Sequence, residues 1–234
     1  MNRFRPLQSS LLALALLSLT GGMAHAAKDP FKNTRELFKE AYTQAATQPG
    51  DEKKDSEALR HYPLYPYLQA ARIKRELSQA TNELGPADQS AETFISYYER
   101  EPVGRDLRGA WLSSLAARRQ WQPFLQHYND RSASDSLRCQ SFTARIALGQ
   151  TQDLALDIAR QWLTPVSLPD CEQAFDWMRA QNALTPELIE QRVRRALENN
   201  NASFARQIAA GLPPDRAAPL LRWAALLENP QKQI

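Results

Sequence analysis

Apolar residues recur every three to four positions along almost the whole chain beyond residue 30, which is the spacing of amphipathic α-helices. The segment that begins at Thr34 is an example, and the threonine side chain can cap a helix there. Pro49 and Gly50 interrupt the pattern. The sequence therefore predicts a helix from Thr34 to this Pro-Gly pair. Its apolar stripe consists of Leu37, Phe38, Ala41, Tyr42 and Ala45.

The same pattern predicts about ten or eleven short helices in all, joined by tight turns. No alternating strand pattern of convincing length occurs. The further helical segments are 51–60, a helix through Leu77 that follows a proline-bearing turn, 91–100, 105–118, 121–128, 135–148, a helix with Leu154, Ile158 and Trp162, a helix with Phe175 and Met178, a helix that starts at Thr185 and Pro186, 201–210 and 216–227.

Caps and breakers predict where these helices end. Gly149 stands where the left-handed residue after helix 135–148 is expected. Thr151 and Asp170 are expected to cap the two helices that follow, and Ser90 is expected to start segment 91–100. Breaks in the chain are predicted at Gly85, Pro86, Pro102 and Gly104.

The composition agrees with a helical chain. The 234 residues include 34 Ala and 31 Leu but only 3 Val and 7 Ile, and helices prefer Ala and Leu while sheets prefer β-branched residues. Only 8 residues are Gly, which disfavours glycine-rich phosphate loops. Ala147-Leu148-Gly149 and the hairpin after it resemble Ala196-Leu197-Glu198 and its hairpin. We therefore expect an all-α fold, an irregular superhelical array of short helix pairs like an α-solenoid.

Residues 1–26 have the features of a secretory signal peptide, with Arg3 and Arg5 before a short apolar run at 11–19. Ala24-His25-Ala26 offers small residues for cleavage between Ala26 and Ala27. The alternative is an uncleaved N-terminal anchor. Export to the periplasm is the expected outcome, with residues 27–234 forming one helical-repeat domain.

Charge adds little to this prediction. The chain has 29 Lys+Arg and 26 Asp+Glu, and removal of Arg3 and Arg5 leaves 27 and 26, a net charge of about +1. A nucleic-acid partner is not expected, because binding needs a concentrated basic face. No second long apolar run follows the signal, so no transmembrane segment is expected in the mature chain.

The two cysteines, Cys139 and Cys171, favour a disulfide in an exported protein. The alternatives are a metal pair or a reactive thiol. Neither has a C-x-x-C motif or a nearby histidine to support it.

Catalytic chemistry is poorly indicated. His61 and His127 have no matching Ser-Asp or Cys arrangement, and no His, Cys, Asp and Glu cluster has metal-ligand spacing. No catalytic residue, metal or cofactor is therefore predicted. The acidic cluster at 51–57 is interpreted as a solvated face, and Glu187 and Glu190 as acids that complement a helix N-terminus. Most aromatics are expected in the core, although an exposed set could stack on sugar rings. The basic run at 192–195 is interpreted as helix surface.

One heptapeptide, Y-P-L-Y-P-Y-L, resembles a stretch near the N-terminus of soluble lytic murein transglycosylases. The Cys139–Cys171 spacing is similar to that family's disulfide, and Gly149-Gln150 and the segment 226–230 are also similar to family segments. The heptapeptide consists of Tyr62, Pro63, Leu64, Tyr65, Pro66, Tyr67 and Leu68.

The resemblance implies a periplasmic protein of cell-wall turnover. Family members cleave the β-1,4 bond between N-acetylmuramic acid and N-acetylglucosamine and release 1,6-anhydromuropeptides. They carry an N-terminal superhelix and a C-terminal lysozyme-like domain with one catalytic Glu. Nothing in this chain resembles the lysozyme-like domain, so the chain is expected to correspond to the superhelix alone and not to catalyse the reaction. An apolar face is then expected to be exposed near residues 220–227.

Three functions remain open at this stage. The first is a non-catalytic superhelical domain that holds peptidoglycan glycan strands. The second is a free-standing periplasmic adaptor that binds protein partners. The third is an enzyme with an unrecognised carboxylate site.

Overall fold

The computed structural model of the protein describes residues 29–229 and 231. Over this range the chain forms twelve α-helices and three short 3-10 helices and contains no strand, which confirms the all-α class. The predicted signal peptide and its cleavage site at Ala26 and Ala27 lie outside the described residues. The helices are α1 Lys32–Ala45, η1 Glu52–Lys54, α2 Glu57–Arg60, α3 Tyr65–Ser78, α4 Pro86–Tyr97, α5 Pro102–Ala117, α6 Trp121–His127, η2 Asp130–Ser132, α7 Asp135–Ala147, α8 Leu154–Trp162, η3 Pro169–Cys171, α9 Glu172–Ala180, α10 Pro186–Glu198, α11 Ala202–Ala209 and α12 Pro214–Glu228.

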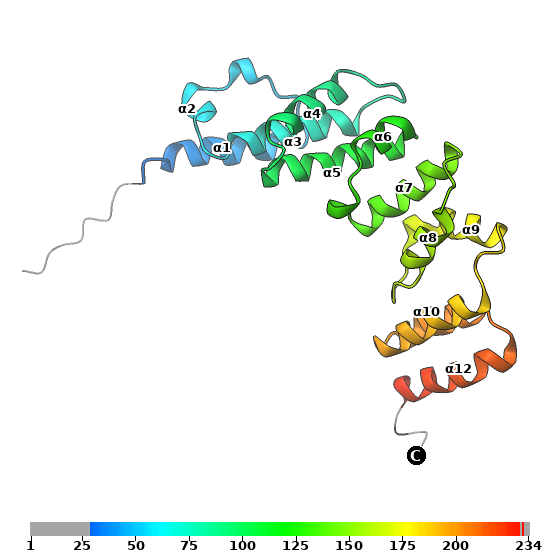
Figure 1. The fold of residues 1–234 in the computed structure, drawn as a ribbon. Helices are drawn as coiled ribbons and strands as arrows, with labels where there is room; N and C mark the ends of the chain where they lie inside the picture. The colour runs from blue at the N-terminus through cyan, green and yellow to red at the C-terminus, as the bar shows by residue number, and fades with distance from the viewer. Residues whose placement is uncertain (1–28, 230, 232–234) are drawn as a thin grey trace, which may run out of the picture.

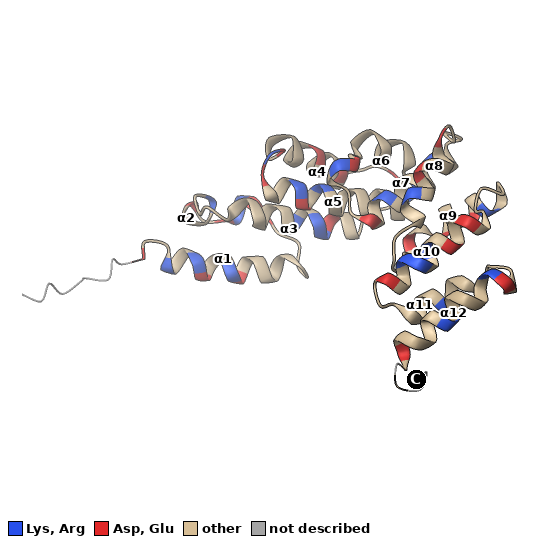
Figure 2. Ribbon diagram, turned by 60° about the horizontal axis from the view of Figure 1, so that its bottom comes forward, with Lys and Arg blue, Asp and Glu red and all other residues tan. Residues whose placement is uncertain are grey.

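The helices form a curved array in which each one packs mainly on the next one or two in sequence (Figure 1). α1 lies at one end of the arc and α12 at the other. Lys and Arg alternate with Asp and Glu along the array (Figure 2). No helix in the described part is long and apolar enough to cross a membrane. Contacts between neighbours only are typical of a solenoid.

The core is a series of small clusters rather than one centre. The first joins α1, α2 and α3, and the second runs from α3 to α7 around Leu107, Leu115 and Phe124, all of which are fully buried. The third lies between α7, α8 and α9, and the fourth joins α10, α11 and α12. Each group of helices therefore buries its own apolar stripes.

Four helices end in the same way. Arg119, Gly149, Asn182 and Asn200 follow α5, α7, α9 and α10 in the left-handed conformation, with φ of 57°, 70°, 54° and 56°. In each case the next residue donates its N–H to the carbonyl oxygen five residues earlier, over 2.8–3.0 Å. This is the Schellman motif, in which glycine is the preferred left-handed residue. Gly149 was predicted at this position, and the motif recurs in the two hairpins whose sequences are similar.

Two predicted breaks are helix starts. α4 begins at Pro86, and Asp88 accepts the Gly85 N–H at 3.0 Å, so Ser90 does not start this helix. α5 begins at Pro102, because proline in the first turn loses no helical hydrogen bond. Gly104 lies in that first turn, where an added Cβ would come within 2.0 Å of the Tyr98 carbonyl oxygen.

Other predicted boundaries also move. Segment 51–60 is not one helix, because Ser56 caps the separate helix α2 by accepting the Leu59 N–H at 3.2 Å. Thr34 lies inside α1 rather than at its cap. α8 begins after Asp153 and not after Thr151, and Asp170 belongs to η3. Thr185 caps α10 as predicted, with Pro186 in the first turn.

Candidate functional site

The heptapeptide Tyr62–Leu68 forms the turn from α2 into α3. Tyr62 packs against Phe38 with ring centroids 5.2 Å apart, and Leu68 is fully buried. Leu64 points outward and is 43% exposed. The motif therefore serves mainly to place α3 against α1.

A buried ion pair lies beside this turn. Arg72 donates two hydrogen bonds to the Asp55 carboxylate, at 2.6 and 2.8 Å, and the Tyr65 hydroxyl donates a third at 2.7 Å. The hydrogen bond from Arg72 holds the pKa of Asp55 below its usual value, and burial raises the pKa of Tyr65. The Asp55 side chain is only 8% exposed, so the interpretation of 51–57 as a wholly solvated face is wrong at this residue.

A second buried pair ties α4 to α5. Arg118 donates to Asp88 at 2.5 and 3.2 Å, and the Trp111 indole N–H donates to the same carboxylate at 2.8 Å. Burial by itself would raise the pKa of Asp88, but the hydrogen bonds from Arg118, the Gly85 N–H and Trp111 together outweigh it and hold the pKa below the usual value. Both buried acids are therefore ionised near neutral pH.

Cys139 and Cys171 form a disulfide that connects α7 to η3. Their Cα atoms are 4.6 Å apart, and both residues are fully buried. Phe142, Ile158 and Phe175 lie in the same cluster. The bond thus anchors the start of α9 to α7.

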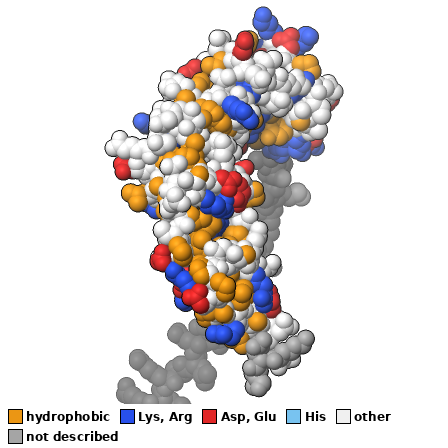
Figure 3. Space-filling view, turned by 90° about the vertical axis from the view of Figure 1, so that its right-hand side faces the viewer, with side chains coloured by type: hydrophobic (Ala, Val, Ile, Leu, Met, Phe, Trp, Pro, Cys, Tyr) orange, Lys and Arg blue, Asp and Glu red, His pale blue; other side chains and the backbone are white. Residues whose placement is uncertain are grey.

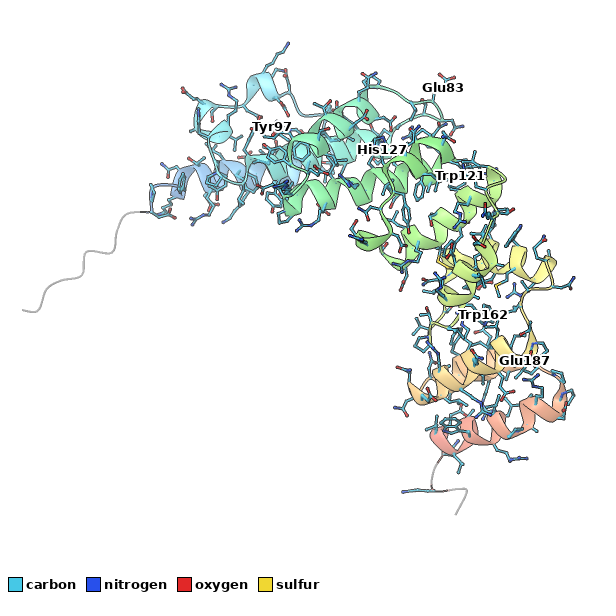
Figure 4. All side chains as sticks on the ribbon, viewed as in Figure 1. Glu83, Tyr97, Trp121, His127, Trp162 and Glu187 are labelled. Atoms are coloured by element: carbon cyan, nitrogen blue, oxygen red, sulfur yellow. A yellow bond between two sulfur atoms is a disulfide. The ribbon has the colours of Figure 1, made fainter. Side chains whose placement is uncertain are left out.

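The candidate chemical groups do not converge on one site. Figure 4 shows His127 on α6 and Glu187 on α10, in separate parts of the arc. His127 lies 3.6 Å from a Glu92 oxygen, and its ring packs on Trp111. Glu187 and Glu190 accept hydrogen bonds from Arg216 at 2.5 and 2.8 Å. Their pKa values are lowered, for Glu187 chiefly by Arg216 and for Glu190 by Arg194 and then Arg216.

Metal binding finds no support in the described residues, where no group of three or more His, Cys, Asp and Glu could hold an ion. Each carboxyl group there with a resolved shift has a lowered pKa, whereas a general acid at neutral pH needs a raised one. These groups are Asp55, Asp88, Asp130, Glu187, Glu190 and Glu228.

Aromatic side chains lie mainly in the core, as expected. Trp111 and Trp162 are 3% and 4% exposed. Three aromatic side chains are exposed in the described part: Phe31 at 41%, Tyr42 at 46% and Tyr97 at 81%, which packs edge-on against Tyr98. Figure 3 shows hydrophobic side chains interleaved with charged ones along one face of the array.

The most unusual polar residue is Arg192, in the middle of α10. It is 3% exposed and lies between three rings, with its guanidinium carbon 4.2 Å from the Trp162 centroid, 5.1 Å from Phe175 and 5.0 Å from Phe204. Such stacking stabilises a cation. Burial lowers the pKa of Arg192 to about 10, so the group stays charged at neutral pH.

The guanidinium also fastens the loop that follows α8. Nε donates to the Thr164 carbonyl oxygen at 3.1 Å and Nη2 to that of Val166 at 3.0 Å. Beside it lies a pocket of about 240 Å³ at the junction of α8–α9 with α10–α11. Its walls include Trp162, Glu172, Arg179, Ile189, Arg192 and Phe204.

Comparisons with known proteins show what this chain is similar to. No family model matches the chain. The chain is 27% identical over 176 residues to the soluble lytic murein transglycosylase of Escherichia coli K12, over 74% of this chain and 26% of that protein. It is 27% identical over 158 residues to the Salmonella typhimurium transglycosylase, over 67% of this chain and 24% of the relative.

Solved structures of lytic transglycosylases have a fold similar to that of this chain. The Pseudomonas aeruginosa lytic transglycosylase Slt, an inactive mutant, superposes with a TM-score of 0.68 at 27% identity, over 85% of this chain and 32% of that chain. The chain resembles the N-terminal superhelical domain of the soluble lytic transglycosylases. The 70-kDa transglycosylase of Escherichia coli has the same fold, with a TM-score of 0.63 at 21% identity, over 87% of this chain and 32% of the transglycosylase.

The chain spans about a quarter of the length of the curated transglycosylases that it matches. The similarity therefore concerns the superhelical part of a transglycosylase and the fold that this part adopts. The similarity does not extend to the substrates of the whole enzymes.

Sequence reasoning missed Arg192, because the run 192–195 was interpreted as helix surface. Arg194 does lie at the surface, paired with Glu190, but Arg192 does not. The spacing indicates that Arg192 is buried. It stands three residues after Ile189 and four before Ala196, on the apolar stripe of α10.

Proposed function

We propose that this chain is an exported, periplasmic scaffold of peptidoglycan turnover, which holds murein glycan strands and does not itself cleave them. The observation that carries the proposal is the similarity to the superhelical domain of soluble lytic murein transglycosylases in both sequence and fold. In those enzymes the reaction implied by the resemblance ends in 1,6-anhydromuropeptides, and here that reaction needs a partner or a further domain.

Two features support a non-catalytic role. The resolved carboxyl shifts all favour the ionised form, because most of these groups pair with arginines. The motif that carries the resemblance, Tyr62–Leu68, packs α3 against α1. Both features belong to the framework of the array.

The test is incubation of the purified full chain with murein sacculi. We expect the protein to sediment with the sacculi and to release no 1,6-anhydromuropeptides by mass spectrometry. A heat-unfolded sample controls for nonspecific sedimentation, and a mock purification controls for contaminating enzymes. Release above the mock level would overturn the non-catalytic assignment.

The second candidate, an adaptor for protein partners, is favoured by apolar side chains at the two ends of the arc. Leu37 on α1 and Leu226 on α12 are 47% and 46% exposed. Of the face expected near 220–227, Leu220 and Ala224 are buried, so only part of it is open. An absence of sacculus binding together with one stoichiometric periplasmic partner would favour this adaptor.

Export is tested by N-terminal sequencing of material from the periplasmic fraction. We expect the mature chain to begin at Ala27. A chain that retains Met1 and stays with the membrane fraction would instead support the uncleaved anchor.

A further inference from the structure

Arg192 differs from Arg72 and Arg118, whose side chains are also largely buried. Arg72 and Arg118 each form a bidentate ion pair with a buried aspartate. Within the described residues, no carboxylate lies within ion-pairing distance of Arg192, which binds only two carbonyl oxygens. A buried cation is usually paired, so the unpaired charge of Arg192 favours a partner from outside the described residues.

One nitrogen of Arg192 is available for such a partner. Nη1 has no hydrogen-bond partner among the described residues, whereas Nε and Nη2 each donate one hydrogen bond. In the same range, the one fully buried side-chain nitrogen or oxygen without a partner is Nε of Arg75. Nη1 therefore keeps some access to solvent, and the space beside Arg192 is the pocket of about 240 Å³.

The other charges around this pocket limit the ligand. Arg179 also stacks on Trp162, at 5.9 Å, but it is paired with Glu172 and Asp176. Glu172, which lines the pocket, repels a multiply charged anion more strongly than a singly charged one. A monoanion is therefore favoured over a phosphate or sulfate.

The size and the lining of the pocket limit the ligand further. Leu184, Ile189 and Ile208 give the pocket apolar walls. A volume of about 240 Å³ corresponds to roughly eight water molecules at about 30 Å³ each. The part of the ligand that enters the pocket must be small, with an apolar group next to its charge.

We propose that the pocket between α8–α9 and α10–α11 binds a monocarboxylate with a small apolar substituent, such as the carboxyl end of a peptide, through Nη1 of Arg192. The carboxylate oxygen accepts a charge-assisted hydrogen bond, and the apolar group lies against Ile189 and Ile208. This inference does not depend on the proposed scaffold function.

The test follows the five tryptophan indole N–H signals by NMR during titration with N-acetyl-alanine. Trp162 forms the floor under Arg192, and its indole donates to the Leu188 carbonyl oxygen at 3.1 Å. We expect a saturable shift of the Trp162 signal and little change at Trp111, Trp121 and Trp223. The uncharged N-acetyl-alaninamide is the matched ligand control, and sodium chloride at equal ionic strength is the salt control.

The enantiomers of N-acetyl-alanine distinguish two sources of the same chemistry. Tighter binding of the D form points to a bacterial wall peptide, and tighter binding of the L form points to a protein C-terminus. Either preference agrees with the proposal, because both ligands carry the predicted carboxylate and methyl group.

Two variants locate the binding. Arg192→Lys keeps a charge but loses the planar group. Gly211→Leu narrows the pocket and leaves residue 192 unchanged, since an added Cβ there would lie 3.6 Å from Ile189 Cδ1. Each is expected to weaken binding at least tenfold, with Gly211→Ala as the mild control. If Arg192→Lys does not fold, Gly211→Leu decides. Equal shifts with the amide, or unchanged binding in Gly211→Leu, would overturn the proposal.

Discussion

Two buried aspartates, Asp55 and Asp88, are expected to make the stability of the protein sensitive to acid. The hydrogen bond from Arg72 holds the pKa of Asp55 below its usual value of 3.8. For Asp88, burial opposes the shift, but the bonds from Arg118, Gly85 and Trp111 prevail. A group whose pKa is lowered on folding stabilises the protein above its unfolded pKa, and that stability is lost as the pH falls through the folded value.

We therefore expect the free energy of unfolding to fall as the pH drops below about 4. Asp88→Asn should destabilise the protein at pH 7 by roughly 3–5 kcal/mol, because it leaves Arg118 buried without its charge partner. It should also flatten the acid limb of the stability curve. Urea unfolding at several pH values measures both effects.

Asp106→Asn is the matched control for Asp88→Asn. Asp106 pairs with Lys74 but is 60% exposed, so its loss should cost no more than about 1 kcal/mol. Equal effects of the two substitutions would contradict the role given to burial.

The left-handed helix ends offer a second test at this scale. Arg119 is exposed and holds a φ of 57°, which costs a residue with a side chain about 1–2 kcal/mol. Arg119→Gly should raise the stability by about 1 kcal/mol and Tm by about 2–4 °C. Gly149→Ala should lower it by a similar amount, because no atom lies near the added Cβ and only the backbone conformation resists it. Calorimetry on both variants checks the opposite signs.

At the scale of elements, the disulfide holds α7 to the start of α9. It closes a loop of 32 residues that contains α8, and the chain-entropy model gives about 3–4 kcal/mol for such a loop. We expect Cys139→Ala with Cys171→Ala to lower Tm by on the order of ten degrees. A reductant should destabilise the natural chain and leave the double variant unchanged. Equal sensitivity of both would show that the effect lies elsewhere.

Helix type could be predicted from the sequence, but several boundaries could not. Leu107 and Leu115 repeat at helical spacing, so α5 was expected, whereas Pro102 carries the same signal for a start as for a stop. Only the packing that brings Gly104 onto the Tyr98 carbonyl decides between them.

The candidate pocket was harder still to predict. A charged residue on an apolar stripe is ambiguous until its surroundings are known. Trp162, Phe175 and Phe204 come from three helices, and no sequence spacing places their rings around Arg192.

For the whole molecule, we expect the junction beside Arg192 to separate two units that unfold independently. The contacts between α10–α12 and the preceding helices include the two carbonyl bonds of Arg192 and the bond from Trp162 to Leu188. Because α10–α12 pack mainly on one another, this group of helices can unfold separately from the rest of the array.

Arg192→Gln should therefore speed hydrogen exchange of the amides in α10–α12 while those of α3–α5 remain protected. Mass spectrometry of peptide fragments measures the exchange. Arg194→Gln, on the same helix but at the surface, is the control and should change little. Uniform loss of protection along the chain would argue for one cooperative unit.

The neighbour-to-neighbour packing of the array has a mechanical consequence. Small changes in the angle between successive helices add up from α1 to α12, so a slight rotation at each step changes the separation of the two ends considerably. The molecule should behave as an elastic array in which stiff helix pairs rotate slightly relative to their neighbours. A strand or partner held at both ends would feel an elastic force that depends on its length.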